Sequence, residues 1–348
     1  MKRKLLSNFG RMAAAALALL MMPLTALDVS ANKALQELNC SGNQPTAFDA
    51  SGCTAINETN FPDENFRAYL LAQNYGKDGI LTDEEIENIT EIDVHERGIS
   101  SLMGINFFTA LKYLFCFNNP LTELEVSANA ELLSLFCSDN QLTELDVSAN
   151  TELQLLLCSS NQLTSLDVSG CTSLQQLNCD KNQLTELDVS GCTELRELCC
   201  NNNQLTALDV SANSKLQILY CYNNQIRGEE MDGLIESLVD RSETLAGYFR
   251  VYYQAAEDES QDGNVCTKEQ VAQAQAKKWT VQYAYRRPDN PERTNYAEYE
   301  GSDADDVASL RADGNADAPL YDLSGRRVQG KPAQKGIYVK DGMKILYK

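Results

Sequence analysis

The chain has 348 residues, a formal net charge of −21 and 43% hydrophobic residues, so it is long enough for two or three domains and too apolar to be disordered. The negative charge excludes nucleic acid and anionic membrane surfaces as partners, since both would repel it. The single histidine, His95, excludes metal sites that need several histidines and leaves one candidate base for catalysis.

The N-terminus has the pattern of an export signal. Four basic residues surround the start of an apolar run over residues 12–22, and small residues follow at Ala26 and Ala31. The run is shorter than the roughly 20 residues that span a bilayer. We therefore expect residues 1–26 to be a cleaved signal peptide, with a buried helix as the alternative. Removal of its four positive charges leaves −25, and the mature chain, without a transmembrane segment, is expected in the secreted fraction or at the cell surface (outer membrane or extracellular).

A degenerate repeat precedes the regular ones. The stretches at 27–30 and 48–51 are 21 residues apart and share the pattern apolar-Asp-small-Ser, with Cys40 and Asn43 between them. We expect one isolated, degenerate N-terminal repeat over residues 27–59.

Residues 60–98 are predicted to form a helical cap that begins with a helix over 61–73. The following loop resembles a calcium loop of the EF-hand or dockerin type, with Asn74, Asp78 and Glu85 at positions one, five and twelve. Position one lacks the usual aspartate and position three is a glycine, so two ligands are weakened. The loop is either a weak Ca²⁺ site or a vestigial helix-turn-helix that covers the open end of the array, and we favour the second. No other cofactor is expected.

A 21-residue period runs through residues 99–226 in six copies of L-x-x-L-x-C-x-x-N-x-L-T-x-L-D-V-S. A fixed period of this length is typical of a solenoid. Strand alternation sends leucine and cysteine inward, and the asparagine at the turn is expected to form a hydrogen-bonded ladder. The second half of each unit is too short and too rich in β-branched residues for a full helix, so extended or 3₁₀ convex segments are expected. The cysteines of this column are Cys116, Cys137, Cys158, Cys179, Cys200 and Cys221.

This unit resembles the leucine-rich repeat family, in a short bacterial form similar to the cysteine-ladder internalins. The resemblance implies an α/β repeat fold: a leucine-rich repeat solenoid with a parallel concave sheet, a helical N-terminal cap, an α/β C-terminal cap and a small β tail. It also implies a binding function. No outward column offers an aligned nucleophile and base, so no catalytic activity is expected.

The remaining cysteines are less regular than the ladder. The ladder thiols lie in a line and do not converge on one point, which excludes a zinc site. They are therefore predicted to form a buried column of small apolar groups. Cys171 and Cys192 lie in adjacent convex turns and either form a disulfide or stay free. Cys199 is predicted to point outward on the concave face as a free thiol.

The C-terminal side departs from the repeat. An α/β cap is expected over residues 227–285, followed by an acidic, Pro- and Asn-containing linker over 286–318. Within the cap, the patterns predict a helix over 229–241, a strand over 248–253, a helix over 267–278 and a strand over 279–285.

The tail, residues 319–348, alternates apolar and polar residues and has two turn signals, at 324–325 and 341–342. It resembles the C-terminal sorting domains of the type IX secretion system of the Bacteroidetes, although it is shorter. The alternative is a small β appendage without a transport role.

Aromatic residues dominate the outward columns of the predicted concave sheet at both ends of the array. The candidate ligand-binding residues are Tyr113, Phe115, Phe117, Phe136, Leu157, Tyr220 and Tyr222. Either they bind an extracellular protein or glycan, or the caps fold over them. The sequence therefore favours an exported leucine-rich repeat protein for binding or adhesion through its concave face. The alternative is a structural cell-surface spacer that carries a sorting tail. The identity of the partner is not in the sequence.

Overall fold

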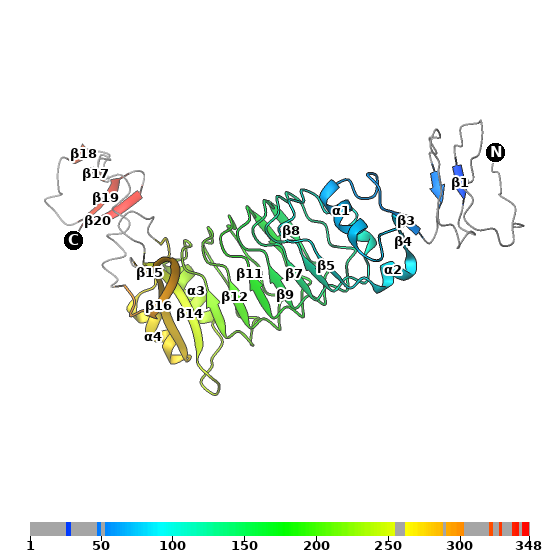
Figure 1. Cartoon of the computed structure of the whole chain (residues 1–348). Coiled ribbons are helices and arrows are strands. Elements are labelled where there is room, and N and C mark those ends of the chain that lie inside the picture. The colour runs from blue at the N-terminus through cyan, green and yellow to red at the C-terminus, as the bar shows by residue number, and fades with distance from the viewer. Residues whose placement is uncertain are drawn as a thin grey trace, which may run out of the picture.

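The computed structural model of the chain describes residues 26–28, 47–49, 53–254, 262–287 and 290–302, and four short strands between 320 and 347. The proposed signal peptide, residues 1–26, lies almost entirely outside the described residues. The described chain is an elongated coil with a cap at each end of the repeats (Figure 1). No helix among the described residues has the length and apolarity to cross a membrane.

One ten-stranded sheet runs along the whole coil. Consecutive strands pair in parallel through β15, and only the last strand, β16, is antiparallel to its neighbour. Each repeat contributes one strand of three residues, which is enough because the strands of neighbouring coils satisfy each other's backbone groups. The strands are β5 (Glu91–Asp93), β6 (Tyr113–Phe115), β7 (Ser134–Phe136), β9 (Leu155–Leu157), β11 (Gln176–Asn178), β12 (Glu197–Cys199), β13 (Ile218–Tyr220), β14 (Gly247–Gln254), β15 (Trp279–Arg287) and β16 (Asn290–Glu298).

The core is a set of straight columns inside the coil. The middle residue of each strand and the ladder cysteine that follows it are buried, as the alternation predicts. Burial raises the pKa of these thiols, that of Cys137 to about 12, so they stay neutral and pack as small apolar groups.

The asparagine ladder is confirmed, and each member makes the same three contacts. In Asn182 the side-chain nitrogen donates to the carbonyls of Cys158 and Cys179, at 3.1 and 3.0 Å. Its side-chain oxygen accepts from the backbone nitrogen of Leu163 at 3.0 Å. Each asparagine thereby ties its own turn to the preceding one, in the buried interior where an unpaired backbone group costs most.

A second polar column runs along the convex turns and explains the irregular cysteines. Its members are Asn129, Asn150, Cys171, Cys192 and Asn213, 21 residues apart. The asparagines donate to carbonyls of the previous turn, and the two cysteines do the same through sulfur, Cys171 to Val147 at 3.2 Å and Cys192 to Val168 at 3.5 Å. Both thiols are free, so the disulfide alternative was wrong: each cysteine substitutes for an asparagine of its own turn.

The convex segments are extended, as expected. Two of them, β8 (Glu144–Asp146) and β10 (Ser165–Asp167), pair in parallel with each other apart from the main sheet. The aspartates that end these segments accept a hydrogen bond from the serine two residues on, for example Asp146 Oδ1 from the nitrogen of Ser148 at 2.8 Å. They therefore form turns. The short 3₁₀ helix η1 (Ile105–Phe107) lies in the first coil.

The N-terminal cap combines two helices and a short hairpin. Helix α1 (Glu64–Ala72) begins at Asp63 and buries Phe66 and Leu70, and helix α2 (Asp83–Asn88) begins with a capping box. Strand β3 (Cys53–Ala55) pairs with β4 (Ile80–Thr82), so the residues from 53 onward belong to this cap and the predicted boundary at 59 was wrong. Strands β1 (Ala26–Asp28) and β2 (Ala47–Asp49) pair in parallel at the expected 21-residue offset.

The main sheet begins with strand β5, which lies within the predicted cap. Ile92 and Val94 occupy the inward positions that leucine and cysteine hold in the repeats, and Asn119 Oδ1 accepts from the nitrogen of Ile99. The array therefore begins before residue 99, because apolar residues other than leucine fill the first coil equally well.

The C-terminal cap contains the predicted helix–strand–helix–strand order, in which α4 (Lys268–Ala276) packs against β15 and against α3 (Glu229–Ser237). Thr267 and Gln270 form the expected capping box. The linker prediction was wrong for its first half, because β16 returns antiparallel to β15 and Tyr299 donates to the carbonyl of Cys266. This hairpin is rich in tyrosines and poor in aliphatic residues. The linker was predicted from its low aliphatic content, and that criterion does not detect such a hairpin.

The tail forms a separate four-stranded antiparallel sheet, in the order β18-β17-β19-β20. Its hairpins span the two predicted turn signals. The strands are β17 (Leu320–Asp322), β18 (Arg327–Val328), β19 (Gly336–Lys340) and β20 (Met343–Tyr347).

Candidate binding surface

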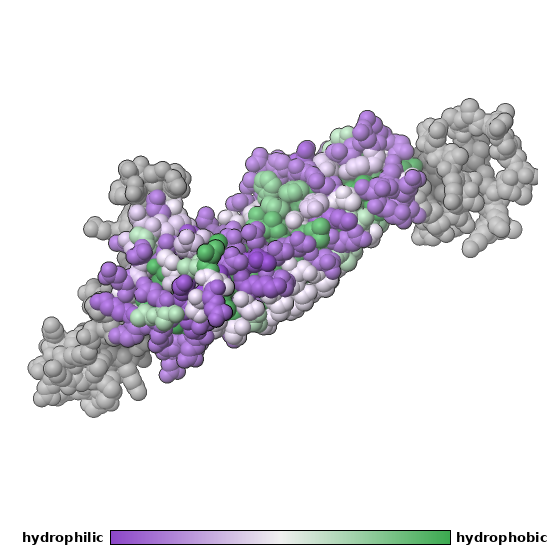
Figure 2. Space-filling view, turned by 90° about the horizontal axis from the view of Figure 1, so that it is seen from below, coloured by the Kyte–Doolittle hydropathy of each residue, from purple (hydrophilic) through white to green (hydrophobic). Residues whose placement is uncertain are grey.

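Large apolar side chains gather on the outward face of the main sheet over β6, β7 and β9. Strand register places them in adjacent columns, with Phe115 beside Phe136 and Leu157 next in line. The rings of Phe115 and Phe136 lie 4.8 Å apart, and Tyr113 is 38% exposed while its neighbours are half-buried. We call this surface the concave patch: Tyr113, Phe115, Phe117, Phe136, Leu155 and Leu157. Figure 2 shows an apolar area on the array with polar surface around it.

Leu155 was missed by the sequence reasoning. It pairs with Ser134 and with Gln176, and so lies in the same column as Tyr113. In the motif it occupies the variable position before the inward leucine, and a check of that position for apolar residues would have found it.

The edge of the concave patch on the N-terminal side is charged. The His95 ring stacks on Phe117 with 4.6 Å between ring centres, and its Nδ1 lies 2.5 Å from Asp93 Oδ1. Asp93 is the neighbour of Phe115 in the strand register. These contacts hold the only imidazole of the chain against the aromatic cluster.

Polar residues separate the two ends of the concave face. The rungs of β11 and β12 present Gln176, Asn178 and Glu197, and Gln176 donates to Glu197 at 3.3 Å. Burial raises the pKa of Asp180 in the next column. The seven predicted ligand-binding residues therefore do not form one surface: five lie in the concave patch, and Tyr220 and Tyr222 lie beyond the polar rungs.

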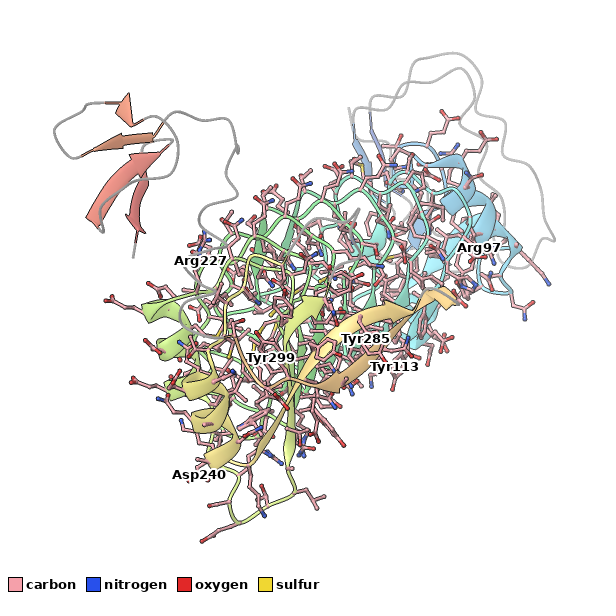
Figure 3. All side chains as sticks on the ribbon, turned by 90° about the vertical axis from the view of Figure 1, so that its left-hand side faces the viewer. Arg97, Tyr113, Arg227, Asp240, Tyr285 and Tyr299 are labelled. Atoms are coloured by element: carbon pink, nitrogen blue, oxygen red, sulfur yellow. The ribbon has the colours of Figure 1, made fainter. Side chains whose placement is uncertain are left out.

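The C-terminal cap covers this far end. The Arg250 guanidinium lies between the rings of Tyr220 and Tyr296, at 3.9 and 3.3 Å from their centres, and its Nε donates to Gln282 at 3.0 Å. Tyr222 stacks on Tyr253 and is only 7% exposed. The alternative that a cap folds over the aromatic residues therefore holds at this end alone. Tyr285 and Tyr299 belong to the same tyrosine-rich hairpin region (Figure 3).

Cys199 lies in the outward column, between Asn178 and Tyr220, and is a free cysteine. It is only 8% exposed, however, and burial together with the neighbouring Glu197 raises the pKa of its thiol. The predicted outward, free thiol is therefore confirmed, but the side chain is buried by its neighbours on the sheet face.

Asn264 is a ladder residue that the 21-residue period does not reveal. Its side-chain nitrogen donates to the carbonyls of Cys221 and Val251, and its oxygen accepts from Ile226. It repeats the contacts of the ladder asparagines although it lies 40 residues after Asn224. The buried Asp262 beside it accepts from three backbone nitrogens, while burial raises its pKa to about 7.

The residues of the calcium-like loop make contacts within the cap. Asn74 accepts from Lys77, Asp78 from the nitrogen of Ile80, and Glu85 from both the nitrogen and the hydroxyl of Thr82. Among the residues that the structure describes, no group of three His, Cys, Asp or Glu side chains has a geometry for a metal ion. Calcium binding at Asn74, Asp78 and Glu85 stays a prediction.

Comparisons with known proteins identify the repeats. Residues 193–236 match the family described as "Leucine Rich repeats (2 copies)". Internalin J of Listeria monocytogenes is 37% identical over 93 residues, which is 26% of this chain and 10% of the relative. The chain therefore spans only a small part of the length of that relative.

Two solved structures are similar in part. The functional domain of InlJ from Listeria monocytogenes, which includes a cysteine ladder, is 32% identical over 59% of this chain and 49% of that one, with a TM-score of 0.44. A leucine-rich repeat protein of Leptospira interrogans is 20% identical over 57% and 52%, with a TM-score of 0.42. The chain thus contains leucine-rich repeats and is similar, over part of its length, to internalin J.

Proposed function

We propose that the chain is an exported binding or adhesion protein that holds another protein on its concave patch. The observation that carries the proposal is the patch itself: six large apolar side chains on one sheet face, of which Tyr113 is exposed and the others are half-buried. Contiguous apolar surface of this kind, rimmed by polar residues, is typical of protein interfaces. The similarity to internalin J and the match to leucine-rich repeats support a binding scaffold.

A protein fits the concave patch better than a glycan does. Phe115, Phe136 and Leu157 offer no hydrogen-bonding group, whereas the many hydroxyls of a sugar need donors and acceptors to replace water. Buried aromatic and aliphatic anchors are the groups that dominate affinity between proteins. A glycan remains the alternative outcome of the test below.

The test is capture by the purified chain and by the double variant Phe115→Ala/Phe136→Ala, followed by mass spectrometry of the retained proteins. We expect the variant to lose the captured partner by at least tenfold, since hot-spot truncations cost about 2 kcal/mol or more each. Leu71→Ala/Leu245→Ala removes two exposed leucines outside the sheet and is the matched control. Equal capture by both variants would mean that the concave patch is not the binding surface, and retention of carbohydrate alone would favour the glycan.

We also propose that residues 1–26 direct export and that the tail is a sorting module similar to those of the type IX system. The tail sheet has its own strand pairing, distinct from that of the ten-stranded sheet, which supports an independent module. Deletion of residues 319–348 in the source cell should abolish surface display while the purified protein keeps its partner. Unchanged display would reduce the tail to an appendage without a transport role.

A further inference from the structure

The convex side of the array carries a groove that the proposed function does not use. Its volume is about 1330 Å³, and it runs across the Thr-x-Leu-Asp segments of successive coils from Ser101 to Asp209. Leucines such as Leu124 and Leu166, both half-buried, form part of its floor. A smaller hollow of about 400 Å³ shares residues 207–209 with it and continues along α3. We call the two together the acidic groove.

The acidic groove is charged with one sign only. The larger part is lined by eight Asp and Glu residues, among them Glu123, Glu144 and Glu186, and by no Lys, Arg or His. The smaller part adds Glu230 and Glu236 of α3. None of these ten carboxylates forms an ion pair with another described residue. The acidic groove thus has leucines at its floor and carboxylates without ion-pair partners at its walls. It fits an occupant with apolar and cationic side chains.

The tail of the same chain has this chemistry. Residues 319–348 contain seven Lys and Arg and two Asp, a formal side-chain charge of +5 on a chain whose total is −21. Its four strands pair only with each other, and sequences such as Gly336–Lys340 and Met343–Tyr347 are rich in aliphatic and aromatic residues. A small single-layer sheet needs another surface to bury its apolar residues.

The tail is also close enough along the chain. Ser302, the last described residue of the cap, bonds the backbone of α4 and its N-terminal flank, and α4 packs on α3, which lines the near end of the acidic groove. The 16 residues from 303 to 318 reach up to about 55 Å when extended. Four steps between stacked strands, from the coil of Leu124 to that of Leu208, cover roughly 20 Å.

From these observations we infer that the tail, residues 319–348, docks into the acidic groove of its own chain. The contact pairs tail lysines and arginines with groove carboxylates and brings apolar residues of the tail onto the leucine floor. It is independent of the concave patch, which lies on the outward face of the main sheet, and of whether the tail also serves in sorting.

The test is zero-length carbodiimide cross-linking of the purified full chain, which joins lysines to carboxylates in direct contact. We expect cross-links from tail lysines such as Lys340 and Lys344 to groove carboxylates within one chain. These cross-links should be lost at about 1 M salt, because the Debye screening length is then only about 3 Å. The second readout is tryptic cleavage of the tail in the folded protein, which docking slows.

A triple variant, Glu123→Gln/Glu144→Gln/Glu186→Gln, removes three exposed charges and should speed tail cleavage by about tenfold, because three surface ion pairs are lost. The control Glu87→Gln/Glu152→Gln/Glu243→Gln lowers the negative charge equally elsewhere on the surface and should leave cleavage unchanged. The inference is overturned if tail lysines cross-link only to other carboxylates or to a second copy, or if the triple variant and salt leave cleavage unchanged.

Discussion

The two ends of the outward sheet face use aromatic residues in opposite ways. At the N-terminal end, the rings of Phe115 and Phe136 meet each other and remain half-exposed. At the C-terminal end, Tyr220 and Tyr296 enclose the Arg250 guanidinium, and Tyr222 is buried against Tyr253. The same strand positions therefore form an open surface in one place and a packed cap contact in the other.

The difference comes from the segment that the chain forms after each strand. Around β6 to β9 the chain turns at once into the next coil, so nothing from the sequence nearby returns over the sheet. After β15 a hairpin returns as β16 and brings Tyr296 across the last rungs. Tyrosine suits the covered end because its hydroxyl keeps a polar group at the rim while the ring packs. An outward aromatic residue is therefore a binding candidate only where no later segment covers it.

Asn264→Ala should have the largest effect, because this side chain joins the covered end to the last regular coil. The substitution leaves the carbonyls of Cys221 and Val251 and the nitrogen of Ile226 without their partner. We expect a loss of about 3 kcal/mol in the free energy of unfolding, measured by urea denaturation. Asn106→Ala, at an exposed position, is the control, and an equal effect of the two variants would show that the ladder does not extend into the cap.

Arg250→Ala should come next. It removes the stacking of two tyrosine rings and one hydrogen bond to Gln282, so we expect a loss of about 2–3 kcal/mol. Arg250→Lys keeps the charge but not the planar group, and should recover less than half of this loss. Arg227→Ala, an exposed arginine near the same cap, should change stability by less than about 0.5 kcal/mol. If Arg250→Ala is equally harmless, the tyrosine hairpin is held by other contacts.

Phe115→Ala/Phe136→Ala should cost less stability although it removes more carbon atoms. Both rings are half-exposed, so the loss of apolar burial is incomplete, and we expect about 1–2 kcal/mol for the pair. The same urea experiment measures it. A loss above that of Asn264→Ala would mean that the open end is part of the core and not a surface kept free for a partner.

Ser160→Asn should stabilise the chain slightly. Ser160 has a φ of 54°, in the left-handed region, and the equivalent turn positions Asn118, Asn202 and Asn223 hold the residue that tolerates it best. We expect a gain of about 0.5–1 kcal/mol and no change in partner capture. A destabilised variant would indicate that the Ser160 hydroxyl makes a contact of its own.

Periodicity accounts for most of what the sequence predicts correctly. The inward leucines, the cysteine column and the asparagine ladder follow from residue types that recur at a fixed spacing, because each coil meets only its two neighbours. The helices of both caps follow from local patterns, such as the capping box at Thr267 and Gln270.

The errors lie where a contact joins residues far apart in the chain without a repeating interval. Asn264 continues the ladder after an insertion, so its spacing carries no signal. Tyr296 of β16 packs on Tyr220 at the covered end, and no pattern within the coil of Tyr220 and Tyr222 predicts this contact. Cys171 and Cys192 are a different case: Asn150 and Asn213 share their 21-residue spacing, so the repeat itself contains the evidence that a thiol replaces an asparagine as donor at these two positions.

The most direct test of the open and covered ends is hydroxyl-radical footprinting of the purified chain, read residue by residue with mass spectrometry. Phe115, Phe136 and Tyr113 should be oxidised several-fold faster than Tyr222 and Tyr253, and the difference should fall when the Arg250→Ala variant loosens the covered end. Equal protection of Phe115 and Tyr222 in the intact chain would contradict the account, because the concave patch would then be covered before any partner arrives.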